Sequence, residues 1–467
     1  MSEMDTSVTT TDLRPLPPAP KLRKALGPGV ILVAGALGSG ELIIWPSIGA
    51  QFGLGLLWLA VLAVGTQYFI NMEIARYTLA TGEAVTRGLA KMWKPWLFVV
   101  IALTIIPYLW PGWATGAATL LTFAFGGGNV TVIATCALIA IALALTLSPV
   151  VYKTLEKVQM VFVAIMIVFI VIAVAFAVSA GTWGEAVKGI VSVGTWPEGL
   201  GLSLALSAVG AAGAGGAVTL AYSNFLRDKG QGMAHYAPRI VSPFTGEEVS
   251  IDAPGEPFAD TSENAARWKS WWKVTNREQL ITFFALGSLG IVVMSSIAYS
   301  ALAGQTPKPG LGFLNQVADA LTSSVGRWFA LVFLVVVASR LLSTNVTLID
   351  VMGRVTADAT KAIAEYRGKS LSESKAYVAV VWGVSLLAIA LLFSGFNQPL
   401  VLLLIGTALT GAATFVFAMG ILFLNRTRLP KRLRISGVRL VAMIWACILY
   451  GALTIGLVVQ EIGKLLA

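Results

Sequence analysis

The chain has 467 residues, of which 57% are hydrophobic and only 12% are charged, and its formal net charge is +10. In a soluble domain about a quarter of the residues are charged, so this composition excludes a soluble protein and favours an integral membrane protein. Most Lys and Arg residues fall in connections that are predicted to share one side of a membrane, so the basic excess reflects topology and not nucleic-acid binding.

Eleven apolar stretches are long enough to cross a bilayer as helices, for which about 20 residues are needed. In chain order they are 29–51, 54–76, 96–122, 129–149, 157–180, 200–226, 277–303, 327–351, 377–395, 398–424 and 437–460. The distribution of basic residues predicts a cytoplasmic N-terminus. We therefore expect residues 1–24 to be a disordered cytoplasmic tail, and residues 25–467 to be one transmembrane domain in a bacterial cytoplasmic membrane.

The first and the sixth stretch are each interrupted by glycine near their middle. Lipid cannot satisfy the backbone groups that such an interruption frees, so each break is expected to line a polar cavity. Breaks at corresponding points of two halves are typical of the central site of a transporter. The predicted substrate-binding residues are Gly38, Ser39, Gly40 and Glu41 in the first break, and Gly213, Ala214, Gly215 and Gly216 in the second.

The positions of the two breaks predict an all-α fold with a five-plus-five inverted repeat of the LeuT type. Repeat one covers about 25–180, repeat two covers about 195–425, and 437–460 is an extra helix. Alternating access would then come from rocking of spans one, two, six and seven against the others. A second interpretation stays open, in which the glycines only allow close helix packing.

A long cytoplasmic loop, residues 228–275, joins spans six and seven. It contains the run from Trp268 to Lys273, which includes three tryptophans. This run is typical of an anchor at the membrane interface, and an amphipathic regulatory helix is the alternative. The role of the loop stays open.

Glu41 is a carboxylate at mid-depth in a membrane, and such a residue is a functional candidate by default. It could ligate a hard cation, carry a proton, or pair with Arg340, which lies deep in span eight. Arg340 needs a partner, for which Glu41 and Glu73 are candidates, or it could itself stand in for a bound cation.

Three hydroxyl side chains follow Arg340 on one helical face: Ser343, Thr344 and Thr347. Sodium sites of LeuT-type proteins combine oxygens of span eight with carbonyls of span one, so a sodium site is one interpretation. Hydroxyl side chains are also common in membrane helices without any ion, and this second interpretation stays open.

The start of the chain resembles Nramp-type divalent-metal transporters. The similarity consists of Gly27-Pro28-Gly29, the exit Ala50-Gln51-Phe52-Gly53, and the end of span two around Ala80-Thr81-Gly82. The resemblance implies a LeuT-type fold and a metal site formed by an Asp-Pro-Gly-Asn turn in span one and a Met-Pro-His turn in span six.

This sequence departs from that pattern at the site itself. In span one the aligned aspartate is Gly38, the proline is Ser39 and the asparagine is Glu41, and in span six the methionine becomes Ala214. The soft thioether that favours transition metals is therefore absent from that position.

Taken together, the sequence predicts a secondary-active transporter, or symporter, that moves a hard divalent cation, Mg²⁺ or Mn²⁺, with Glu41 as metal ligand. The alternative is a carrier of a small organic or other non-metal solute, because small residues at the site would leave more space. We expect no enzymatic activity and no cofactor, and the expected partners are the substrate and the lipid bilayer. The coupling ion and the oligomeric state stay open.

Overall fold

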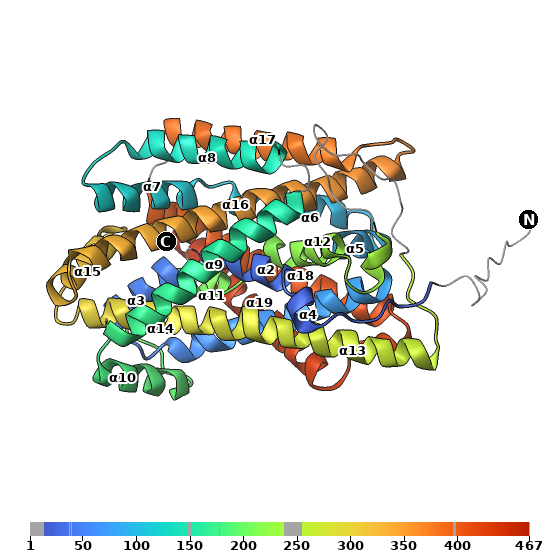
Figure 1. The fold of residues 1–467 in the computed structure, drawn as a ribbon, viewed down its shortest axis with the longest axis horizontal. Coiled ribbons are helices and arrows are strands. Elements are labelled where there is room, and N and C mark those ends of the chain that lie inside the picture. The colour runs from blue at the N-terminus through green and yellow to red at the C-terminus, as the bar shows by residue number, and fades with distance from the viewer. Residues whose placement is uncertain are drawn as a thin grey trace, which may run out of the picture.

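The structure is a computed structural model that describes residues 14–36, 38, 40–147, 151–176, 178–237, 255–395 and 398–466 (Figure 1). Within these residues, nine helices are long and apolar enough to cross a membrane. They are α4 (Leu57–Thr81), α6 with α7 (Trp96–Tyr108 and Gly112–Phe125), α8 (Val130–Leu147), α9 (Val151–Phe176), α13 with η3 and α14 (Ser262–Gln279, Leu280–Ala285 and Leu286–Ala301), α16 (Arg327–Tyr366), α17 (Glu373–Phe393), α18 (Pro399–Thr427) and α19 (Gly437–Leu466).

The two remaining spans are broken, as the glycines predict. Span one consists of α2 (Pro28–Ala36), the π-helical turn η1 (Gly40–Ile44) and α3 (Trp45–Phe52), with a bend of 43° between its two parts. Span six consists of α11 (Leu202–Ala211) and α12 (Ala217–Lys229), and Gly216 between them has a φ of +60° that favours glycine. The prediction of about eleven spans with spans one and six broken is therefore confirmed.

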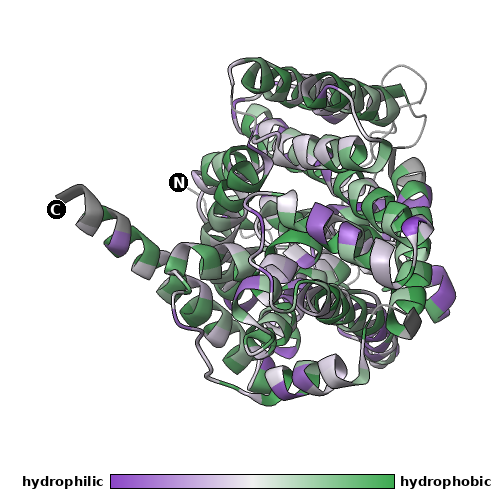
Figure 2. Ribbon diagram, turned by 90° about the vertical axis from the view of Figure 1, so that its left-hand side faces the viewer, coloured by the Kyte–Doolittle hydropathy of each residue, from purple (hydrophilic) through white to green (hydrophobic). Residues whose placement is uncertain are grey.

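The outer surface of the bundle is apolar. Figure 1 shows α8 and α17 side by side along one edge, and Figure 2 shows hydrophobic residues on most helices around the perimeter. Large side chains such as Val132, Val171, Leu386 and Val441 are more than half exposed there. An apolar surface of this extent fits contact with lipid and not with water.

The long helix α16 lies at the centre of the bundle and positions the broken spans. It packs against α2 and α12, which are one half each of spans one and six, and also against α6, α7, α9 and α17. The other half of span six, α11, packs on α18 and α19. The two breaks therefore meet in the interior, between α16 and α18.

Span seven begins earlier than the sequence predicts. Its helix is continuous from Ser262 to Ala301, and α13 starts where the Thr261 hydroxyl accepts the Asn264 N–H at 3.1 Å. The predicted loop 228–275 therefore contains the first turns of this helix, together with the short helix η2 (Gly232–Tyr236), while residues 238–254 lie outside the described residues.

The N-terminal segment 14–21 is packed on α13, followed by the short helix α1 (Leu22–Ala25). Leu16 is fully buried, its N–H donates to Asn264 Oδ1 at 3.0 Å, and its carbonyl accepts from Arg267 at 2.7 Å. The Trp271 indole donates to the Pro17 carbonyl at 2.7 Å. Residues 14–24 are therefore not the disordered tail we expected, and residues 1–13 lie outside the described residues.

We call the end of the bundle that holds this segment the inner end, and its cytoplasmic location stays a prediction. A buried ionic network joins α12 to α16 and α17 there. Arg354 pairs with Asp228, and its Nε lies 2.6 Å from Asp350. Arg227 donates to Glu373 at 2.7 Å. The network ties the inner half of span six to the central helix.

Arg354→Met removes one of the two arginines of this network and leaves the buried Asp228 and Asp350 without the cation that pairs with both. Breaking a buried pair in this way costs about 3–5 kcal/mol, so we expect a large fall in the unfolding temperature of the purified protein in detergent. The exposed Arg426→Met is the matched control, with an expected change within about 0.5 kcal/mol. Equal small effects in both variants would contradict the structural role of the network.

Leu16→Ala tests the docking of the N-terminal segment. Loss of a buried leucine side chain costs about 2 kcal/mol or more, which raises the population of the undocked segment about 30-fold. We expect trypsin to cleave after Lys21 faster by about the same factor, and mass spectrometry of the fragments measures the cleavage rate. Pro18→Ala, at an exposed position of the same segment, should leave the cleavage rate unchanged.

Candidate functional site

The two breaks touch each other through their backbones. A Cβ atom added to Gly40 would lie 1.8 Å from the Ala211 carbonyl oxygen, at the end of α11. One added to Gly38 would lie 2.1 Å from Thr344 Oγ1, on α16. Both interpretations of the glycines therefore apply, because the helices are broken and the glycines also allow the closest backbone approach.

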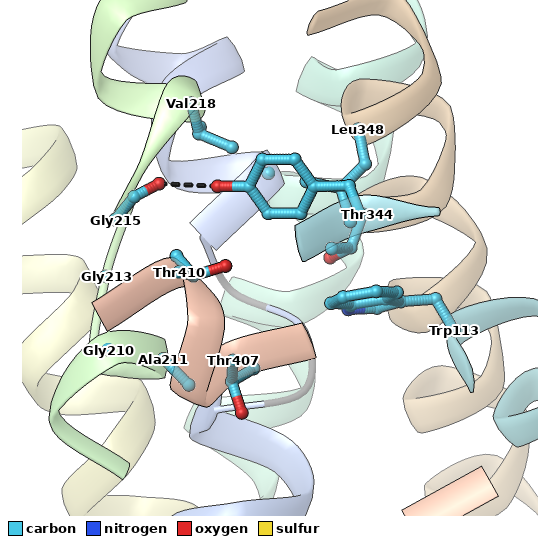
Figure 3. A pocket seen from close by; sticks show the side chains of 12 residues that line it. Trp113, Gly210, Ala211, Gly213, Gly215, Val218, Thr344, Leu348, Thr407 and Thr410 are labelled. Carbon is cyan, nitrogen blue, oxygen red and sulfur yellow. Dashed lines mark hydrogen bonds between the residues drawn. The ribbon is translucent and has the colours of Figure 1, made fainter. Parts of the chain in front are cut away.

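A small cavity of about 30 Å³ lies beside this contact, which is room for about one water molecule. Figure 3 shows its lining, to which spans one, three, six, eight and ten contribute. The predicted residues Gly213, Gly215 and Thr344 belong to it. Tyr108 also lines it, and its hydroxyl donates to the Gly215 carbonyl at 2.7 Å.

Three threonines of α18 lie at the second break, and they were not among the predicted site residues. Thr407 and Thr410 line the cavity, and the Thr414 hydroxyl accepts the Gly216 N–H at 2.7 Å. This last bond satisfies a donor at the start of α12. The spacing of three and four residues, which places the hydroxyls on one helical face, is the signal that could have identified them.

The rest of the second break is held by side chains of spans two and six. A Cβ atom on Gly213 would lie 2.5 Å from Gln67 Oε1. The amide of Gln67 donates to Tyr450 on α19 at 2.7 Å, so the extra helix reaches the site through this residue. The Ala214 carbonyl accepts a hydrogen bond from the Thr219 hydroxyl.

Glu41 lies in the first turn of η1 and is fully buried. One carboxyl oxygen accepts the Gly38 N–H at 3.1 Å. The other oxygen, Oε1, has no hydrogen-bond partner among the described residues. A buried oxygen in this state needs an explanation, and a bound cation and a proton on the carboxyl group are the two chemical ones.

Arg340 and its neighbours join α16 to the end of α2. The Arg340 guanidinium donates to the Ala34 carbonyl at 3.0 Å and to the Ser343 hydroxyl at 3.2 Å. The Gln159 amide donates to Thr347 Oγ1 at 2.8 Å, and the Gln159 carbonyl oxygen accepts from Ser343. Gln159 was missed, although it is a buried polar residue inside the predicted span 157–180.

Glu73 is not part of this site. It pairs with Arg76 at 2.6 Å, accepts from Asn425 at 3.2 Å, and lies 3.7 Å from Arg439. Its role as the partner of Arg340 is therefore wrong, because the arginines of its own neighbourhood already neutralise it. Ser39 lies outside the described residues, and within the described ranges no group of three or more His, Cys, Asp and Glu side chains could hold a metal ion.

The fold and the two breaks define a membrane transporter of the LeuT type. The family profile described as Nramp, natural resistance-associated macrophage protein-like, matches residues 29–460. The chain therefore belongs to the Nramp family, and it is a secondary-active transporter rather than an enzyme.

Solved structures with the same fold support this assignment. A point mutant of the Eremococcus coleocola manganese transporter is 13% identical with a TM-score of 0.70, and the match covers 98% of this chain and 92% of that one. MhsT in complex with L-phenylalanine is 14% identical with a TM-score of 0.51, and the match covers 94% and 100%. No curated protein sequence matches the chain significantly.

Gly40→Ala tests the contact between the breaks. The added methyl group meets the backbone of Ala211, which has no flexible side chain to move away, so we expect a loss of about 3 kcal/mol or more. The unfolding temperature in detergent measures this loss. Gly383→Ala on α17 is the matched control: nothing lies within 4 Å of its added Cβ, and helix propensity predicts a change of at most about 1 kcal/mol, stabilising.

Proposed function

We propose that the protein transports a hard divalent cation, Mg²⁺ or Mn²⁺, by alternating access, and that Glu41 is its charged ligand. The observation that carries the proposal is the fully buried Glu41 carboxylate, whose Oε1 has no partner among the described residues. A carboxylate in the interior of a membrane protein is costly to bury and is usually retained for an ion or a proton.

The remaining donors around the breaks are oxygens. Four of the residues that line the cavity beside the breaks carry hydroxyl groups: Tyr108, Thr344, Thr407 and Thr410. Oxygen donors suit Mg²⁺ and Mn²⁺, whereas the soft transition metals prefer sulfur and nitrogen. Mg²⁺ also keeps several of its waters, so few protein ligands suffice for it.

A solved structure with the same fold also supports the proposal. The solved structures of the same fold include a manganese transporter, so the fold accommodates a divalent metal as substrate. The organic alternative depends on extra space at the small residues of the two breaks. That space is filled, because the two breaks approach each other and leave a cavity of only about 30 Å³. No observation on this structure favours the organic alternative.

Uptake of Mg²⁺ and Mn²⁺ into proteoliposomes tests the proposal, with native protein compared with Glu41→Gln. The amide keeps the size of the side chain and removes its charge, so we expect saturable uptake by the native protein and a loss of at least about 100-fold in the variant, equivalent to about 2.7 kcal/mol. Titration calorimetry on the same samples separates lost binding from lost turnover.

Glu83→Gln serves as the control for removal of a buried carboxylate elsewhere. Glu83 pairs with Lys91 at 2.7 Å and accepts from Tyr77 at 2.8 Å, and neither partner lines the cavity. Uptake by this variant should stay within a few-fold of the native rate. If the folded native protein neither binds nor transports either metal, the divalent-cation proposal is wrong.

A further inference from the structure

Two basic segments of the chain meet at the inner end of the bundle. One is the start of α13, where Lys269 and Lys273 are exposed. The other is the connection between α18 and α19, which over residues 426–434 carries basic residues and no Asp or Glu. The two segments are joined by Arg432, whose guanidinium donates to the Phe258 carbonyl at 2.7 Å and pairs with Asp260, just before α13.

Three aromatic rings form a continuous row along this contact, which we call the aromatic shelf. The ring centroids of Phe258 and Trp268 are 5.7 Å apart, and Trp268 stacks on Trp272, also at 5.7 Å. A guanidinium lies over each end of the shelf, with Arg432 at 5.0 Å from the Phe258 ring and Arg439 at 4.6 Å from the Trp272 ring. Contacts of this kind are favourable, so the shelf is held in place by arginines from two other segments.

A cavity of about 180 Å³ lies beside the aromatic shelf. Its lining combines apolar side chains with two cations and includes no carboxylate: Phe258, Ala265, Trp268, Lys269, Arg432 and Leu433. An apolar wall next to two positive charges suits a ligand that is itself amphipathic and anionic.

Both cations keep donors for such a ligand. Lys269 has no ion pair within the described part of the chain, and the carboxylates closest to it in sequence are engaged elsewhere, Glu263 with Arg267 and Asp260 with Arg432. A guanidinium has five N–H groups. Asp260 and one backbone carbonyl account for two of those of Arg432, and the others are not used by the described residues.

The cavity lies at the level of the lipid headgroups. The exposed apolar surface of α19 begins at Val438, which is 77% exposed, and the next residue, Arg439, packs on Trp272. Trp268 and Lys269 precede Trp272 by about one helical turn, or about 5 Å along α13. The headgroup layer on each side of a bilayer is about 5–8 Å thick. A cavity one turn beyond the start of the lipid-facing surface is therefore within this layer.

We propose that this cavity binds the headgroup of an anionic phospholipid. Lys269 and Arg432 bind the phosphodiester, and the apolar part of the lipid next to it lies on Phe258 and Trp268. Basic pockets between membrane helices suit anionic headgroups in this way. A soluble phosphate has the same charge but no apolar part to cover the aromatic shelf, so the lipid is the favoured source. The bound lipid links span seven to the connection that leads into α19.

This inference goes beyond the proposed function, because it concerns a second ligand and holds for any transported substrate. Its test therefore uses lipid binding and protein stability, without divalent metal. A failure of Mg²⁺ or Mn²⁺ uptake and a failure of lipid binding are thus separate results.

The first measurement uses the native full-length chain in a neutral detergent. The unfolding temperature and native mass spectra are recorded while phosphatidylglycerol or phosphatidylcholine is added in equal amounts. We expect a saturable rise of the unfolding temperature and retained lipid adducts with phosphatidylglycerol only. Equal effects of the two lipids, or no effect of phosphatidylglycerol, would overturn the inference.

Glycerol 3-phosphate, added to the same sample, distinguishes the two sources of the phosphate group. We expect no saturable shift from it at the concentrations at which phosphatidylglycerol acts. A shift as large as that from the lipid would assign the cavity to a soluble phosphate compound, and the lipid proposal would then be wrong.

The second measurement compares three variants at exposed positions of α13. Lys269→Gln removes one cation of the cavity, so we expect about five-fold weaker binding of phosphatidylglycerol. Ala265→Phe fills the cavity without a change of charge, and we expect a larger loss. Lys273→Gln is the matched control, because Lys273 does not line the cavity, and it should bind the lipid as the native protein does.

These variants separate a defined site from general attraction to a basic surface. Equal losses in Lys269→Gln and Lys273→Gln would show that only overall charge matters, and they would overturn the assignment. Native-like binding by folded Ala265→Phe would also contradict it, because the headgroup could not then lie in the cavity.

Discussion

Each break in a membrane helix frees backbone donors and acceptors that lipid cannot satisfy, and the interior of this protein is organised by that constraint. The Ala34 carbonyl is met by Arg340, the Gly215 carbonyl by Tyr108, and the Gly216 N–H by Thr414. The three partners come from spans eight, three and ten. Helices that flank the broken pair therefore hold the unwound backbone in one geometry, which is a requirement for any binding site built from it.

The sequence predicted the features that depend on local patterns. Apolar length identified the spans, and glycine interrupting an apolar run located both breaks. Two partners of the breaks, Tyr108 and Thr414, were not predicted, because they reach the breaks only through tertiary packing, and Gln159 reaches Ser343 and Thr347 of α16 in the same way. Spacing within one helix could have flagged the α18 threonines, but nothing local indicates which helix they face. The docking of Leu16 on α13 was missed for the same reason, because a short polar and proline-containing segment carries no periodicity.

The fold is that of the Nramp family, and the sequence differs from the family pattern at the residues of the two breaks. At the positions of the aspartate and the methionine of the family pattern, this chain has Gly38 and Ala214. The glycines at the breaks do not leave an empty chamber, because the backbone of one break moves into the space that a side chain of the other would need, as at Gly40 and Ala211. Charge at the centre is then concentrated in one carboxylate, Glu41, and one guanidinium, Arg340, which interact electrostatically.

The hydrogen bond between Gln67 of α4 and Tyr450 of α19 has an energetic consequence for the transport cycle. An exact inverted repeat would make the inward-facing and outward-facing states pseudo-mirror images with equal free energy. The eleventh helix lies outside the repeat and packs on α4 of repeat one and on α11 and α18 of repeat two. It is also bonded to span seven, the counterpart of span two, because Arg439 of α19 donates to Asn276 of α13 at 2.7 Å. A motion that separates either span from α19 breaks a hydrogen bond worth about 1 kcal/mol. The bond to Gln67 is buried and the bond to Asn276 is only partly buried, so the extra helix adds unequal terms to the two orientations of the carrier before any substrate or gradient acts on it.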